Sequence, residues 1–147
     1  MATYSFLDVQ ATIAGPNGTI PIGSGAGAAE EGITYEQVDD LNKMDIGADG
    51  TGMFSLHASK GARITVRLLK TSPTNSLLNT MVQLDRLSGA TNGQNTMSIV
   101  NIATGDDTTF RQVAFGRIPT INYQKDGGMI EWEFLAVYSD PILGANV

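Results

Sequence analysis

The chain has 147 residues and a mass of 15.5 kDa, the size of one ordinary domain, so we expect a single domain over residues 1–147. It contains no cysteine and one histidine, His57, which excludes a disulfide framework, a cysteine nucleophile and a multi-histidine metal centre. No apolar run approaches the ~20 residues that a membrane span requires, and no basic and apolar leader precedes Tyr4. We therefore expect neither a membrane segment nor a secretory leader.

The net charge is −6, and charged residues make up only 16% of the chain, where about 25% is usual. An acidic protein has few counterions to release, so we do not expect it to bind phosphate backbones tightly. A surface of small uncharged polar groups suits a subunit that its neighbours cover. The alternative is a soluble β-domain with an ordinary surface.

The charges are unevenly distributed. Residues 1–50 hold eight acids and one base, whereas residues 51–147 hold seven acids and eight bases. Seven of the acids lie in residues 30–49, and no acid lies between Lys60 and Lys70. The pattern indicates either two solvated faces or complementary surfaces that meet between copies of the protein.

The first third of the chain favours short strands. Tyr4 to Ile13 alternates between apolar and polar residues, which predicts a strand buried on one face. The segment 15–18 supplies turn chemistry, and Thr19 to Ile22 is expected to return as a short strand. The glycine-rich segment 23–32 is predicted to be a loop.

The next segments predict a hairpin after a long polar loop. Ile33 to Val38 is expected to be a brief strand, and Asp39–Gly52 is long, polar and punctuated by glycine. Met53 to Ala58 and Ala62 to Lys70 alternate again, and the short segment 59–61 between them predicts that these two strands pair.

One helix is predicted, from about Pro73 to Leu87. Ser72 suits the N-cap, Pro73 suits the first helical position and Gly89 is placed to end the helix. Its apolar residues spread over roughly 220°, which is wider than a helix on one sheet requires, and Asp85 projects into this arc. We infer a helix covered on two sides, one of them by another subunit; the alternative is that Leu87 is merely exposed.

The last part of the chain predicts four strands, at Thr96–Ala103, Thr108–Phe115, Ile118–Lys125 and Met129–Tyr138. The turn signal at residues 126–128 predicts that the last two form a hairpin. In the final strand one face is expected to be core: Ile130, Trp132, Phe134, Ala136 and Tyr138. Many short strands with one helix predict a mainly β protein, an antiparallel sandwich or barrel with one flanking α-helix.

Short motifs for cofactors and metals are weak. Residues 23–28 fit G-x-G-x-x-A, but Ile33 opens a strand pattern where dinucleotide binding needs a helix. Residues 45–50 resemble a calcium loop, but Gly47 occupies its third position and Leu56 its twelfth.

Candidate catalytic groups are equally weak. His57 among scattered serines and aspartates is no triad signal. Glu131 and Glu133 share a strand face as paired carboxylates would, but a solvated or lumen-facing strand end explains them better. We therefore predict no catalytic residues, no cofactor, no metal and no enzymatic activity.

Four long segments together cover nearly the whole chain: SFLDVQATIAGPNGTIPIGSGAGAAEEGIT, IGADGTGMFSLHASKGARITVRLLKTSPTNSLLN, GQNTMSIV and FGRIPTINYQKDGGMIEWEF. Read together, they resemble a family of small phage structural proteins that is similar to the tail tube proteins of contractile-tailed bacteriophages. The resemblance implies a β-sandwich or barrel with one flanking helix, and six-fold rings stacked into a hollow tube inside a sheath. Through that tube the viral DNA passes into the host cell.

The resemblance also implies partners and a location. The expected partners are further copies of the chain, the tail sheath protein, and the baseplate and tail terminator proteins, with no membrane. Viral DNA is expected to pass through the lumen without specific binding, and an acidic chain suits such a conduit. The expected location is the virion tail, after assembly in the host bacterial cytoplasm.

Two sets of assembly residues are inferred. The loop Asp39–Gly52 is expected to be a ring-stacking arm, since a structureless excursion of this length is usually functional, with charged residues Asp39, Asp40, Lys43, Asp45 and Asp49. We expect the acidic segment 30–49 to meet bases of another subunit, and Asp85 to pair with one of these bases. The inter-subunit residues are Glu30, Glu31, Lys60, Arg63, Arg67, Lys70 and Asp85.

Three alternatives remain at this point. The first is a virion decoration module or a receptor- or glycan-binding module. The second is the tube subunit of another contractile injection machine, and the third is an enzyme that uses His57. Few aromatic residues are available to stack on sugars, and only scattered carboxylates accompany the histidine.

Overall fold

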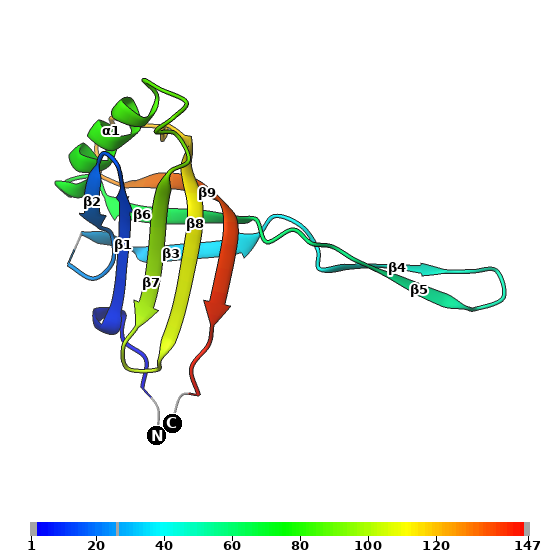
Figure 1. Ribbon diagram of the computed structural model, residues 1–147. Coiled ribbons are helices and arrows are strands. Elements are labelled where there is room, and N and C mark those ends of the chain that lie inside the picture. Colours follow the sequence, from blue (N-terminus) through cyan, green and yellow to red (C-terminus); the bar gives the residue numbers. More distant parts are fainter. Residues whose placement is uncertain (1–2, 26, 146–147) are drawn as a thin grey trace.

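The structure is a computed structural model that describes residues 3–25 and 27–145, and of residues 28–31 it describes the backbone alone. It contains a seven-stranded sheet, a separate two-stranded sheet and one α-helix (Figure 1). The predicted mainly β class with one flanking helix is confirmed. The elements are η1 (Phe6–Asp8), β1 (Val9–Gly15), β2 (Gly18–Pro21), β3 (Ala28–Gln37), β4 (Asn42–Ile46), β5 (Gly52–Leu56), β6 (Ala62–Leu69), α1 (Thr74–Asp85), β7 (Asn95–Asn101), β8 (Asp106–Arg117) and β9 (Met129–Ile142).

The large sheet is antiparallel and folds over itself. Its order is β2-β1-β7-β8-β9-β6-β3, so β2 and β3 are the two edges. Strand β9 pairs with β6 through residues 129–136 and with β8 through residues 133–142, and it therefore belongs to both halves of the sheet. In Figure 1, β3 and β6 run across the direction of β1, β7 and β8.

The core lies between the two halves, and α1 closes one end of it (Figure 1). Each fully buried large apolar side chain stabilises the fold by about 1.5–3 kcal/mol relative to exposure. The largest of these side chains are Phe110, Phe134, Ile13, Ile22, Ile64, Leu68, Leu78, Met81 and Met97. No helix in the described part of the chain is long and apolar enough to cross a membrane.

A bulge in β8 sets which residues face the core. Against β7, the register moves from Met97↔Phe110 to Asn95↔Val113. The extra residue is accommodated at Gln112, which has a φ of 54°. As a result Phe110 and Val113, three residues apart, are both fully buried. Simple alternation along the sequence cannot predict this pair.

Several predicted elements are confirmed with small shifts. Strand β1 buries Val9, Ala11 and Ile13, and the segment 15–18 is the turn that joins β1 to β2. The helix begins after Pro73, and Ser72 Oγ accepts a hydrogen bond from the Thr74 amide at 3.3 Å. Ser72 therefore satisfies a first-turn amide without being the N-cap residue.

Two boundaries near the N-terminus were predicted wrongly. Residues 6–8 form the short 3-10 helix η1 instead of the start of a strand, because Ser5 Oγ caps it by accepting from the Leu7 amide at 3.2 Å. The segment 23–32 is not a loop throughout, since β3 begins at Ala28. The register of β3 against β6 shifts between Ala28 and Ile33, and Gly32 has a φ of 64° there.

Two of the predicted hairpins, at residues 53–70 and 118–138, are wrong. Strand β5 pairs with β4, whereas β6 pairs with β3 and β9. Residues 118–125 form no strand, and β8 pairs directly with β9 across the long connection 118–128. The two sides of β9 are occupied by β6 and β8, which leaves no ladder position for 118–125.

Candidate assembly surfaces

The two-stranded sheet forms a long arm that projects away from the body (Figure 1). We define the arm as residues 39–57, which contain β4, β5 and their connections. Asp39–Gly52 was predicted to be structureless, and it is instead half of a regular hairpin whose central pair is Met44↔Phe54. Residues Leu41 and His57 close its base, where the His57 amide donates to the Leu41 carbonyl at 2.9 Å.

One face of the arm is apolar and uncovered. Side chains alternate along a strand and directly paired residues share a face, so one face combines four large apolar residues. These side chains are between 59% and 81% exposed, and they are Met44, Ile46, Phe54 and Leu56. An isolated hairpin is marginally stable in water, and a contiguous exposed apolar surface marks a site of interaction.

The arm is also acidic. The structure brings the five predicted ring-stacking residues together on it, and all of them are exposed: Asp39, Asp40, Lys43, Asp45 and Asp49. The Thr51 amide donates to Asp49 Oδ1 at 3.0 Å, and this bond, followed by one from the Thr51 hydroxyl, lowers the pKa of Asp49 below its ordinary value of 3.8. The tip of the arm therefore keeps its negative charge in mild acid.

His57 serves the base of the arm. Its ring Nδ1 lies 2.8 Å from the carbonyl oxygen of Asp40, on an exposed segment. This contact joins the two ends of the arm to each other at its base. Among the described residues no group of three or more His, Asp or Glu side chains is arranged to hold a metal.

The bases predicted to meet another subunit have partners within the chain. Arg63 Nε lies 3.1 Å from Glu133 Oε1, Arg67 Nε lies 3.3 Å from Glu131 Oε1, and Lys60 Nζ lies 3.6 Å from Asp140 Oδ1. The two glutamates weighed as paired carboxylates are thus partners of arginines. Exposed pairs of this kind contribute about 0–1 kcal/mol each. Contact of these bases with a second subunit stays a prediction.

The remaining predicted contact residues divide into three cases. Lys70 Nζ donates to the carbonyl oxygen of Asn122 and lies 4.2 Å from the centre of the Tyr123 ring. The side chains of Glu30 and Glu31 lie outside the described residues. Asp85 is treated below, because the structure places it in the interior.

Asp85 is 1% exposed and pairs with two amides, so the predicted pairing with a base is wrong. Asn17 Nδ2 donates to Asp85 Oδ1, and Asn95 Nδ2 donates to Asp85 Oδ2 at 2.8 Å. These bonds join the last turn of α1 to the β1–β2 turn and to the start of β7. A buried carboxylate with such donors needs no second subunit.

The outer side of α1 carries an apolar stripe that the body does not cover. Leu78, Met81 and Val82 face the core, whereas Leu77, Leu84 and Leu87 are exposed, Leu87 by 80%. At 100° per residue, Leu77, Thr80 and Leu84 fall within about 60° of one another on the helix surface, and Leu87 follows in the turn after α1. The wide apolar arc predicted from the sequence therefore consists of two faces of the helix. One face packs in the core, and the other is exposed on the single subunit.

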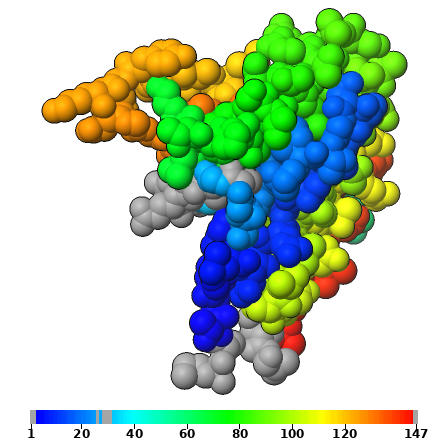
Figure 2. All heavy atoms as spheres, turned by 90° about the vertical axis from the view of Figure 1, so that its left-hand side faces the viewer, coloured from blue at the N-terminus to red at the C-terminus, as the bar shows by residue number. Residues whose placement is uncertain are grey.

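The helix end of the body is rich in bases. Figure 2 shows the segment 118–128 projecting beside α1. Between α1 and the end of β8 lies a groove of about 410 Å³, with Arg86 and Arg117 among its lining residues. The charges of residues 70–88 and 115–128 are four bases and two acids, Asp85 and Asp126, of which Asp85 is buried. These two segments therefore carry more positive than negative charge, and one of their bases, Arg117, is paired with Glu133 at 3.6 Å.

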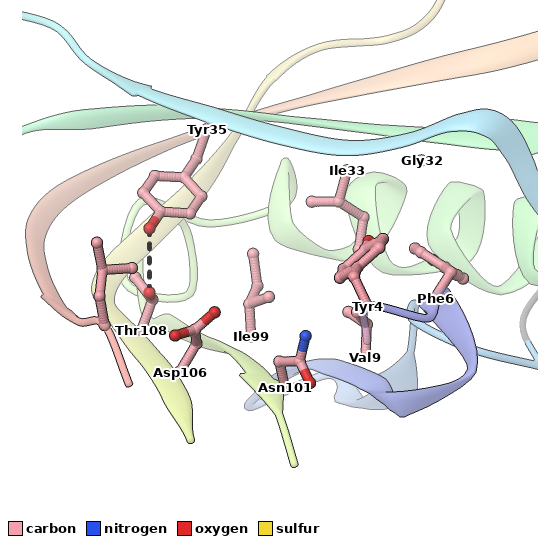
Figure 3. Close-up of a pocket in the computed structure, with 11 residues that line it drawn as sticks. Tyr4, Phe6, Val9, Gly32, Ile33, Tyr35, Ile99, Asn101, Asp106 and Thr108 are labelled. Carbon is pink, nitrogen blue, oxygen red and sulfur yellow. Dashed lines mark hydrogen bonds between the residues drawn. The ribbon is translucent and has the colours of Figure 1, made fainter. Parts of the chain in front are cut away.

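A second cavity, shown in Figure 3, has Tyr4 and Leu143 among its lining residues. Its volume is about 510 Å³, and Ile33, Ile99 and Phe6 line it together with Tyr35 and Asp106. Tyr35 Oη and Thr108 Oγ1 lie 3.2 Å apart across its wall. Among the described residues, the lining contains one carboxylate and no lysine, arginine or histidine.

The G-x-G-x-x-A motif at residues 23–28 leads into the strand β3. Dinucleotide binding needs a helix at this point, so the motif does not have the required context. Two surface features were missed from the sequence. The apolar face of the arm was hidden because Met44 and Ile46 stand among polar residues. The pairing of Arg63 and Arg67 with Glu133 and Glu131 was signalled by their matched spacing on two alternating strands.

The family model described as the Bacteriophage PhiTE tail tube protein matches residues 1–144 of the chain. No curated protein sequence matches the chain significantly. The resemblance inferred from the sequence is thus confirmed by an independent match over almost the whole length.

Solved structures from contractile injection systems share the fold at low sequence identity. A structure of the cap that terminates the tube of the anti-feeding prophage has a TM-score of 0.57 at 10% identity, covering 98% of this chain and 95% of that one. A chain of the PVC sheath–tube complex in the extended state has a TM-score of 0.52 at 12% identity, with coverage of 91% and 88%. A chain of the PVC sheath/tube terminator has a TM-score of 0.52 at 14% identity, with coverage of 97% and 98%.

Proposed function

The chain belongs to the bacteriophage PhiTE tail tube protein family, and we propose that it is the repeating subunit of a phage tail tube, in which hexameric rings stack into a hollow conduit for viral DNA. The family is one of structural proteins and not a class of enzymes. We also propose that residues 1–147 act as one domain. The observation that carries the proposal is the arm, because its apolar face remains exposed on the single subunit.

The arm supports assembly from identical copies. Four apolar side chains on a projecting hairpin gain stability only when another surface covers them. A contact between two different patches of identical subunits is heterologous and generates a ring or an open filament. We assign ring stacking to the arm, with Asp39, Asp40, Lys43, Asp45 and Asp49 as its charged residues.

The sheet edges support closure within a ring. Strands β2 and β3 are the edges of the seven-stranded sheet, and exposed edges invite pairing with other strands. Joining the sheets of neighbouring subunits into one continuous barrel would remove these edges. The net charge of −6 disfavours tight binding of phosphates, so DNA would slide through the lumen.

We propose the tail sheath, baseplate and tail terminator proteins as further partners. The fold is shared with chains from a sheath–tube complex and from a sheath/tube terminator, which supports the first and the last of these. The corresponding location is the virion tail, after assembly in the cytoplasm of the host bacterium.

Electron microscopy of the purified full chain tests the proposal. We expect hollow tubes or six-fold rings, in equilibrium with free subunits at low concentration. The matched control replaces residues 42–56 by Asn-Gly, a two-residue turn that suits the paired ends Leu41 and His57. This arm-shortened variant should keep the circular dichroism of a β protein and stay monomeric. A native chain that remains monomeric at high concentration would contradict the proposal.

The tube of another contractile injection machine is the second candidate, favoured by the shared fold with the PVC and anti-feeding prophage structures. Antibodies against the chain distinguish the two. Labelling of the tail of DNA-filled virions supports the phage tube, whereas labelling of particles without a capsid supports the alternative.

A further inference from the structure

We propose that the apolar face of the arm of one copy packs on the outer stripe of α1 of a second copy. The stripe consists of Leu77, Thr80, Leu84 and Leu87, and the arm contributes Met44, Ile46, Phe54 and Leu56. This inference rests on the proposed function, because it names the surface that receives the arm during assembly.

The two surfaces match in chemistry. The arm presents four exposed apolar side chains, and the stripe presents three exposed leucines beside Thr80, with Leu87 in the turn after α1. Neither row is covered by the described part of the same subunit. Burial of both rows removes apolar area from water on the two sides of one contact.

The two surfaces also match in charge. The arm carries four exposed acids and one base. The segments 70–88 and 115–128 at the helix end carry three exposed bases, Arg86, Arg117 and Lys125, and one exposed acid, Asp126. Lys70 is half-buried, and Arg117 Nε also lies 3.6 Å from Glu133 Oε2. Opposite charges around an apolar contact fix its orientation and speed its formation.

The placement of the two surfaces favours head-to-tail propagation. In Figure 1 the arm leaves the body on the side opposite to α1. A copy whose stripe receives one arm therefore still extends its own arm to the next copy. A contact of this kind repeats without limit unless it closes into a ring.

The cavity in Figure 3 is the competing apolar surface, and it matches the arm less well. The part of its wall that the structure describes contains Asp106 and no base. An acidic arm tip would be repelled there, whereas it is attracted by the helix end.

Photo-cross-linking in the assembled full chain identifies the surface of the second copy that the arm contacts. Phe54 is replaced by p-benzoylphenylalanine, and chains of natural isotope composition are mixed with ¹⁵N-labelled chains so that links between copies are recognised by mass. We expect cross-linked peptides that contain residues 77–87 of a different copy. The control places the same probe at Lys43, on the opposite face of the arm, and should give few such links. Links from Phe54 to any other segment overturn the assignment.

Variants of the stripe give an independent readout. Leu77→Asp combined with Leu84→Asp places acids opposite the acidic arm. Both positions are exposed, so the fold should be unaffected. We expect the protein concentration at which half of the chain sediments as tubes to rise about tenfold or more, because central apolar contacts are lost. Ile102→Asp, at an exposed position on another surface, is the control and should assemble like the native chain.

The outcomes separate this inference from the proposed function. Absence of tubes from the native chain contradicts the function. A second outcome is that the native chain forms tubes, the arm-shortened variant does not, and the Leu77/Leu84 variant assembles like the native chain. This outcome supports the proposed function and overturns the assignment of the helix stripe as the surface that receives the arm. An equal defect in Ile102→Asp also overturns it, because the effect would not be specific to the stripe.

Discussion

The side-chain amide of Asn95 donates a hydrogen bond to the buried carboxylate of Asp85 at 2.8 Å. Asp85 ends α1 and Asn95 begins β7, so the bond fixes the helix against the sheet. Asn17 donates to the other carboxylate oxygen from the β1–β2 turn. Three separate segments thus meet at a single side chain.

Replacement of Asp85 by alanine should destabilise the subunit. The amides of Asn17 and Asn95 would lose their acceptor, and a buried donor without a partner costs about 1–3 kcal/mol. Urea unfolding of the arm-shortened monomer measures the effect. The exposed Asp126→Ala change is the matched control and should stay within about 0.5 kcal/mol of the parent. Equal midpoints for the two variants would contradict this account.

Gly15 is required by the same cluster. A Cβ atom at Gly15 would lie 1.8 Å from Asn95 Oδ1, so Gly15→Ala forces Asn95 away from Asp85. We expect a loss of about 1–3 kcal/mol in the free energy of unfolding, typical of overpacking. Gly89→Ala serves as control, since a Cβ there meets nothing within 4 Å. Thermal denaturation of both variants compares them directly, and a stable Gly15→Ala protein would refute the role of the glycine.

The carboxyl group of Asp49 should titrate below 3.8. Hydrogen bonds from the Thr51 amide and hydroxyl stabilise its charged form and lower its pKa. The pKa of Asp49 is lower in the folded arm than in the unfolded chain. The stabilisation of the arm tip by these two hydrogen bonds is therefore fully present above the unfolded pKa. It is lost as the pH falls through the lower folded pKa. NMR titration of the side-chain carbonyl carbon checks the direction. Thr51→Val keeps the amide donor, so it should raise the pKa only in part.

The paired charges on β6 and β9 can be exchanged. Arg63→Glu with Arg67→Glu places acids beside Glu133 and Glu131, and should impair assembly while costing the monomer about 1 kcal/mol or less per pair. Adding Glu131→Arg restores the Arg67 pair in reverse, and Glu133 is kept because its Oε2 also lies 3.6 Å from Arg117 Nε. We expect this threefold variant to regain part of the assembly of the native chain in a sedimentation assay. Failure of this rescue would show that the arginines serve acids of another copy.

The sequence predicted the elements whose pattern is local. Strand β1 alternates cleanly and α1 has its start signals at Ser72 and Pro73, so both were found within a few residues. Strands β6 and β9 were found for the same reason, but their partners were not. Pairing is a property of the whole sheet, and both sides of β9 are occupied by β6 and β8, so no pairing position remains for residues 118–125.

The assembly surfaces were only half visible in the sequence. The wide apolar arc of the helix pointed to the free stripe of Leu77, Leu84 and Leu87, and the length of Asp39–Gly52 pointed to the arm. The apolar face of the arm depends on the register Met44↔Phe54, which no local pattern contains. Asp85 was recognised as a carboxylate in need of a partner, but its amides come from residues 68 and 10 positions away along the chain.

The way the arm is rooted determines how it bears force. It continues from the end of β3 into the start of β6, where Gln37 pairs with Ala62 and the Val38 amide donates to the Gly61 carbonyl at 3.0 Å. Tension on the tip is therefore directed along these two strands. It loads the β6–β9 ladder in shear, so that many hydrogen bonds must yield at once instead of opening one after another like a zipper. A tube held together by such arms would resist stretching during ejection far better than the exposed hairpin alone suggests.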